Sequence, residues 1–101
     1  MVPGYEDDVL ENVFENLKEP EMYRVVLHND HYTPRDFVTE ILRRFFQKSG
    51  IEATKIMLAA HKSGKSLVGI YTWDIAATKV TQVHELAKKN EFPLTMTIEQ
   101  E

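Results

Sequence analysis

The sequence predicts an α+β fold, a two-layer sandwich in which three helices cover a three-stranded antiparallel sheet. Three short segments, residues 22–28, 66–72 and 94–98, are rich in β-branched residues or alternate apolar with polar residues, as strands do. Two stretches with helical spacing follow the first strand, and one follows the second. The predicted order is therefore β-α-α-β-α-β, and 101 residues fit one domain of ordinary size.

The first strand, Met22–His28, leads into a polar turn that begins with Asn29, Asp30 and His31. Thr33 has the side chain of a helix N-cap, and Pro34 suits the first helical position because its ring presets the backbone angle φ. The apolar residues that follow recur with helical spacing and predict one buried stripe, made of Phe37, Val38, Ile41, Leu42, Phe45 and Phe46.

Ser49 and Glu52 have the spacing of a capping box and predict the start of the second helix. Gly64 is suited to end this helix in a left-handed conformation. Thr72 or Asp74 is expected to cap the third helix. The inner faces of the two helices are predicted to consist of Ala53, Ile56, Met57 and Ala60, and of Ala76, Val80, Val83 and Ala87.

Residues 1–21 are predicted to form an arm separate from a core domain at 22–101. Acidic residues dominate the arm, although its apolar residues have helical spacing, and Pro3, Gly4 and Pro20 bracket it. It is either a flexible tail or a segment that becomes ordered against a partner.

The composition excludes several classes of function. Cysteine is absent, so disulfides and thiolate chemistry are ruled out. The net charge of −4 argues against a nucleic-acid partner, which would need a concentrated basic face. No apolar run approaches the ~20 residues that cross a bilayer, and the acidic N-terminus lacks the features of a secretion signal. We therefore expect a cytoplasmic protein with no membrane partner.

Few residues have a pattern that suggests a catalytic, ligand-binding or metal-binding site. Asn29 and Asp30 have an ordinary role as turn residues that bind their own backbone, and His61 on an apolar helix face is more often structural than a ligand. A metal site from His28, His31, His61 and Asp30 lacks the spacing of known zinc motifs. No nucleophile motif or phosphate-binding loop is present, so we expect no enzyme, no catalytic residue, no metal and no cofactor.

The runs VVLHNDHYTPRDFV, ATKIMLAAH, GIYTWDIAATKV and FPLTMTIE nevertheless resemble the ClpS family of N-end-rule adaptors over residues 22–99. The resemblance implies a fold similar to the C-terminal domain of a ribosomal stalk protein. It also implies an adaptor, not an enzyme, that binds N-degron peptides and proteins beginning with Leu, Phe, Tyr or Trp. Such an adaptor, expected to be a monomer, delivers them to the N-domain of a ClpA-type Clp AAA+ unfoldase.

By position, the resemblance assigns Asn29, Asp30 and His61 to the substrate's α-amino group. It assigns the side-chain pocket and its rim to Thr33, Arg35, Val38, Met57, Ala60 and Leu94, and unfoldase docking to Asp74, Thr78 and Lys79. An ammonium carries three donors and a positive charge, which a carboxylate, an amide oxygen and a neutral imidazole can accept. An apolar cavity beside them would select a bulky first residue.

Four positions depart from the usual family pattern. His31 stands where Asp is common, Arg35 where many members carry Met at the pocket rim, and Ala60 where Val is usual. On the presumed docking face, Ala77 replaces an acid. Two alternatives remain open on sequence alone. A ribosome-associated or generic protein-interaction domain predicts that Asn29, Asp30 and His61 do not converge. A small metal-dependent enzyme predicts histidine ligands within coordination range.

Overall fold

The first strand of the chain is the central strand of the sheet. In the computed structural model, which describes residues 19–101, β1 (Met22–His28) pairs antiparallel with β2 (Lys65–Thr72) and with β3 (Thr95–Gln100). The sheet order is β2-β1-β3. The three predicted strands are confirmed, although β2 begins one residue earlier and β3 begins one residue later and runs on to residue 100.

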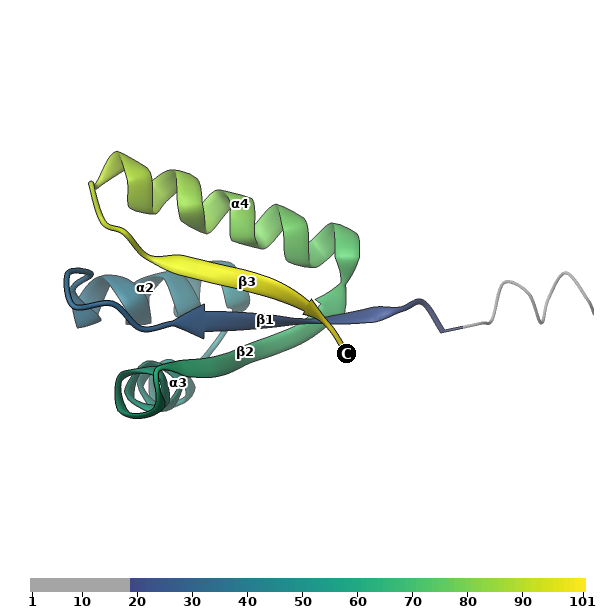
Figure 1. The fold of residues 1–101 in the computed structure, drawn as a ribbon, viewed down its shortest axis with the longest axis horizontal. Helices are drawn as coiled ribbons and strands as arrows, with labels where there is room; N and C mark the ends of the chain where they lie inside the picture. The colour runs from purple at the N-terminus through teal and green to yellow at the C-terminus, as the bar shows by residue number, and fades with distance from the viewer. Residues whose placement is uncertain (1–18) are drawn as a thin grey trace, which may run out of the picture.

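Three helices lie against this sheet: α2 (Arg35–Phe46), α3 (Gly50–Ser63) and α4 (Trp73–Lys89). Figure 1 shows α2 behind the sheet, α3 nearly end-on beside the start of β2, and α4 along β3. The predicted element order and the α+β class are confirmed. Within residues 19–101, no helix is long and apolar enough to span a membrane.

The core lies between the sheet and the helices. Val25 and Leu27 of β1 are buried there together with Ile41 and Leu42 of α2. The helix faces predicted from spacing are confirmed: Ala53 and Ala60 of α3 are buried, as are Ala76, Val80, Val83 and Ala87 of α4. Gly69 of β2 allows a close approach, because a Cβ atom there would lie 2.6 Å from the Tyr71 hydroxyl oxygen.

The helix boundaries confirm one predicted cap and correct another. Ser49 Oγ accepts a hydrogen bond from the Glu52 N–H at 3.1 Å, and Gly64 ends α3 at φ 92° in the left-handed region. The prediction that Thr33 caps α2 is wrong. The helix begins at Arg35, Pro34 occupies the cap position, and the Thr33 hydroxyl donates to Asp30 Oδ2 at 2.8 Å.

Candidate functional site

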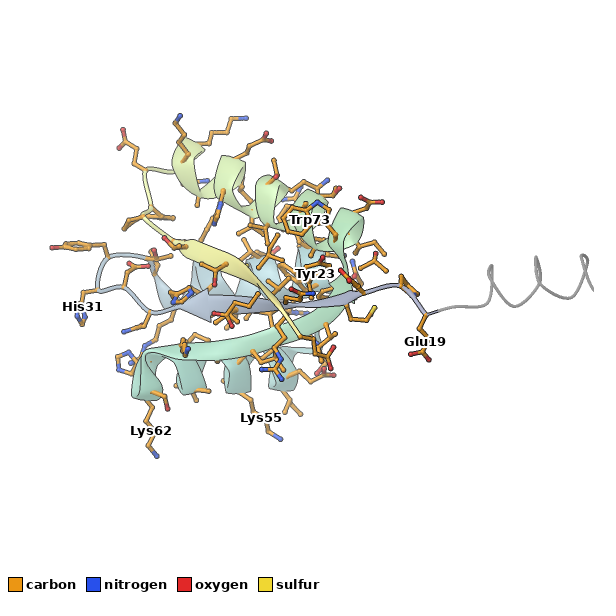
Figure 2. All side chains as sticks on the ribbon, turned by 45° about the vertical axis from the view of Figure 1, so that its right-hand side comes forward. Glu19, Tyr23, His31, Lys55, Lys62 and Trp73 are labelled. Atoms are coloured by element: carbon orange, nitrogen blue, oxygen red, sulfur yellow. The ribbon has the colours of Figure 1, made fainter. Side chains whose placement is uncertain are left out.

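Several segments that are distant in the sequence meet at one end of the sheet. They are the end of β1 with the turn of residues 29–34, the beginning of α2, the last turns of α3, and Leu94 just before β3. Together they line a cavity of about 340 Å³, near the lower limit of common ligand sites. This is the left-hand end of Figure 1; in Figure 2, His31 and Lys62 mark it, while Tyr23 and Trp73 lie together toward the opposite end.

The cavity brings together every residue that the sequence assigned to substrate binding. Its lining includes Asn29, Asp30, Thr33, Arg35, Val38, Met57, Ala60, His61 and Leu94. It also includes five residues that were not assigned to substrate binding: Leu27, His28, His31, Tyr32 and Pro34. Of these, His28 and His31 had been considered only as metal ligands or turn residues, and His31 also as a departure from the family pattern. Strand alternation gives a signal for Leu27, because Val25 and Leu27 share the inward face of β1 and Leu27 is the inward residue nearest the turn.

Asp30 organises the turn. Its Oδ1 accepts hydrogen bonds from the backbone N–H groups of Tyr32 at 2.8 Å and Thr33 at 2.7 Å, and its Oδ2 accepts the Thr33 hydroxyl. The interpretation of Asp30 as a turn residue is therefore confirmed. A carboxylate offers about four lone-pair sites. Three are used here, and one on Oδ2 remains for a further donor.

The same contacts determine the charge of Asp30. Partial burial raises the pKa of its carboxyl, but the hydrogen bonds from Thr33 and Tyr32, helped by nearby His31, outweigh it and hold the pKa below its ordinary value. Asp30 is thus a carboxylate at neutral pH. It places a negative charge beside the cavity.

Asn29 connects the turn to the end of α3. Its backbone N–H donates to the carbonyl oxygen of Gly64 at 2.9 Å. Because Gly64 ends α3 three residues after His61, this bond holds the turn against the part of α3 that carries His61. Within residues 19–101, the Asn29 carboxamide forms no hydrogen bond with another side chain, so its oxygen and its NH₂ group are free for a ligand.

His61 is hydrogen-bonded to Arg35. The guanidinium Nη2 lies 3.0 Å from the imidazole Nε2, and both side chains are exposed at the mouth of the cavity. A guanidinium only donates, so Nε2 must be the acceptor and a neutral ring carries its proton on Nδ1. Nε2 is therefore a lone-pair acceptor on a ring that lines the cavity.

The floor of the cavity is apolar. Val38, Ala60 and Leu94 are 8%, 2% and 5% exposed, and Met57 is half-buried beside them. They come from α2, α3 and the segment before β3, so the floor forms only when these elements pack together. The cavity thus joins a set of hydrogen-bond acceptors at its mouth to an apolar interior.

The metal-site hypothesis has no support in the described part of the chain. No group of three or more His, Asp or Glu side chains there could hold a metal ion. His28 instead lies with its Nε2 2.7 Å from Thr97 Oγ1 on β3.

The residues predicted to dock the unfoldase lie on α4, outside the cavity. Asp74 and Thr78 are exposed, whereas Lys79 is half-buried. The Lys79 ammonium donates to the carbonyl oxygen of Phe45 at 2.5 Å and to Gln47 Oε1 at 3.1 Å. Lys79 therefore holds the C-terminal end of α2 against α4, a structural role that the sequence did not predict.

Comparison with known proteins agrees with this fold. A family model described as ATP-dependent Clp protease adaptor protein ClpS matches residues 18–97. The chain is 47% identical to the ATP-dependent Clp protease adapter protein ClpS of Syntrophus aciditrophicus, over 94% of this chain and 96% of the relative. It is 52% identical to that of Shewanella piezotolerans, over 93% and 92%.

A solved structure is similar as well. It is described as Agrobacterium tumefaciens ClpS2 bound to L-phenylalaninamide, and it is 41% identical with a TM-score of 0.79. The match covers 82% of this chain and all of that one (100%). On these matches, the chain belongs to the ClpS family of adaptors of the ATP-dependent Clp protease.

Proposed function

We propose that this protein binds the N-terminal residue of other proteins when that residue is Leu, Phe, Tyr or Trp, and delivers them to a ClpA-type Clp AAA+ unfoldase. One observation carries the proposal: a cavity with an apolar floor has Asn29, Asp30 and His61 together at its mouth. A generic interaction domain without a pocket predicted that these three residues would lie apart. That alternative is therefore disfavoured.

The chemistry of the site suits a free amino terminus. The α-ammonium would donate to the open lone pair of Asp30 Oδ2, to the Asn29 side-chain oxygen and to His61 Nε2. Bonds of this kind, with a charged donor, are roughly twice as strong as neutral ones. Burying a leucyl or aromatic side chain against Val38 and Leu94 would add about 1.5–3 kcal/mol. The two parts together require both a free amino terminus and a bulky apolar first residue.

The related Agrobacterium protein supports this choice of ligand. L-Phenylalaninamide, to which that protein is bound, has the free α-ammonium and the aromatic side chain of an N-terminal phenylalanine. Neither feature requires a cofactor or a bond-making step. We accordingly propose an adaptor with no catalytic activity of its own.

A fluorescence titration with short peptides that differ only in the first residue tests binding. Peptides beginning with Phe, Leu, Tyr or Trp should bind, whereas those beginning with Ser or Asp should not. Acetylating the amino group of the Phe peptide should abolish binding, because it removes the charge that Asp30 pairs with. Equal affinity for the acetylated peptide would rule out the ammonium site.

Delivery is a separate step. We propose that Asp74, Thr78 and Lys79 form the docking face for the N-domain of the unfoldase, that the adaptor acts as a monomer in the cytoplasm, and that the arm of residues 1–21 takes part in handover. Residues 1–18 of the arm lie outside the described residues. A deletion of residues 1–19 should retain peptide binding and lose degradation of a model substrate by the protease. Unchanged degradation would make the arm a passive tail.

A further inference from the structure

The hydrogen bond between Arg35 and His61 occupies an atom that the proposed function needs. Nε2 of His61 has one lone pair, which accepts the Arg35 guanidinium at 3.0 Å. The same lone pair would have to accept the substrate's α-ammonium. In the free protein, a cation of the chain itself therefore occupies part of the ammonium site.

Binding must displace this cation. Two positive groups cannot share the Nε2 lone pair, and their charges repel each other at short range. Arg35 is exposed and is the first residue of α2, so its side chain can turn toward solvent without disturbing the core. The displaced guanidinium stays at the mouth, but it has lost its acceptor.

Among the described residues that line the cavity, no second acid is present that could replace His61 as the acceptor for the displaced Arg35 guanidinium. Of those that line the cavity, Arg35 carries the one permanent positive charge and Asp30 is the one acid. Three of the lone-pair sites of Asp30 are bonded to Tyr32 and Thr33, and the fourth is assigned to the ammonium. A guanidinium has five donors in a planar fork that matches a carboxylate.

The substrate can supply the carboxylate. With its first side chain in the cavity and its amino group at Asn29, Asp30 and His61, the substrate chain must leave through the mouth, past Arg35. We propose that Arg35 is a specificity-determining residue that reads the charge of the substrate's second residue. It favours a bulky apolar first residue followed by Asp or Glu, and it disfavours Lys or Arg at the second position. This inference rests on the proposed function.

Three fluorescent peptides test it: Phe followed by Glu, Gln or Lys, and otherwise identical. The full-length protein should bind the Glu peptide about three- to tenfold more tightly than the Lys peptide, with the Gln peptide between them, as expected for an exposed, bidentate ion pair. Raising the salt concentration should reduce this preference, because exposed charges are screened.

Variants assign the preference to one side chain. Arg35→Gln should bring the ratio of the Glu and Lys dissociation constants close to one, and Arg35→Glu should reverse it. Arg43→Gln is the matched control, since it removes the same charge from the exposed surface of the last turn of the same helix. Its ratio should equal that of the unmodified protein. Circular dichroism verifies that each variant is folded.

The possible outcomes separate the two proposals. If the Phe-Gln peptide binds but the unmodified protein shows no charge preference, the role of Arg35 is overturned and the proposed function stands. A preference that persists in Arg35→Gln also overturns it. If the Phe-Gln peptide does not bind at all, the proposed function fails, and this inference fails with it.

Discussion

Asp30 accepts hydrogen bonds from both the backbone N–H and the hydroxyl of Thr33, at 2.7 and 2.8 Å. The carboxylate that is proposed to receive the substrate's ammonium is thus also the residue that shapes the turn around it. The shape of the turn and the charge of the Asp30 carboxylate are therefore coupled, because a substitution of Asp30 or Thr33 alters both.

The first prediction uses this coupling. Thr33→Val retains the shape of the side chain but removes the hydroxyl donor from Asp30 Oδ2. The pKa of Asp30, now held below its ordinary value in part by this bond, should rise toward that value. NMR titration of the Asp30 carboxyl measures the change. Thr33→Ser retains the hydroxyl and should leave the pKa near that of the unmodified protein.

Linkage gives the direction of the accompanying effect on stability. A carboxyl whose pKa is depressed in the folded state adds stability above its unfolded pKa of about 3.9, and this stability is lost as pH falls through the folded pKa. Thr33→Val should therefore lose less stability than the unmodified protein between pH 5 and pH 2. An unchanged Asp30 pKa in this variant would mean that the hydroxyl contact does not form in solution.

The second prediction concerns the depth of the cavity. Ala60 is 2% exposed and lines the floor, so a larger side chain there must occupy cavity space. Ala60→Val should weaken binding of peptides beginning with Trp by about tenfold relative to those beginning with Leu, the scale expected for one or two methyl groups in an apolar pocket. Titration with matched Trp and Leu peptides measures the ratio. Ala59→Val, on the exposed side of the same helix, is the control.

The sequence predicted the helix faces well because their signal is local. Ala76, Val80 and Val83 recur with the helical period, and all three are buried. The cap of α2 was predicted wrongly because Thr33 has two possible partners close in sequence. Its hydroxyl bonds to Asp30 on the preceding side, and periodicity cannot show which partner is chosen.

The candidate site could not be predicted from local pattern. Asp30 and His61 lie on a turn and on a helix far apart in the chain, and only tertiary packing brings them to one cavity. The resemblance to a family supplied their pairing. It did not supply the contact between Arg35 and His61, because Arg35 departs from the usual residue at that position.

The third prediction concerns the junction of α2 and α4. Lys79→Met removes the ammonium that donates to the carbonyl oxygen of Phe45 and to Gln47. The free energy of unfolding should fall by about 1–2 kcal/mol, the range for hydrogen bonds to a charged group at a half-exposed position. Urea unfolding measures this free energy.

Thr78→Ala, at an exposed neighbouring position on the same helix, is the control and should change stability by less than about 0.5 kcal/mol. Equal stabilities of the two variants would contradict the structural role of Lys79.

The fourth prediction concerns His84, which connects α4 to β3. Its Nε2 accepts the backbone N–H of Met96 at 3.0 Å, two residues beyond Leu94 at the floor of the cavity. Protonation of Nε2 would abolish this bond. Burial lowers the pKa of His84 below its ordinary value, so the folded protein favours the neutral ring.

The sign of the pH effect follows from the direction of that shift. In the unfolded chain His84 takes up a proton near pH ~6.5, whereas the folded protein resists protonation of His84 until lower pH. The unfolded state therefore binds more protons in this window, and stability should fall as pH drops from about 6.5 through the folded pKa of His84.

The variant His84→Gln tests this effect, because it retains an oxygen that can accept the Met96 N–H but cannot titrate. Urea unfolding of both proteins between pH 8 and pH 5 gives a difference curve in which His28, His31 and His61 cancel, because both proteins contain them. The curve should be flat above about pH 7 and should slope in favour of His84→Gln as the solution becomes more acidic. A difference curve that stays flat down to pH 5 would mean that His84 binds protons equally in the folded and unfolded states, and hence that its bond to Met96 does not hold β3 against α4.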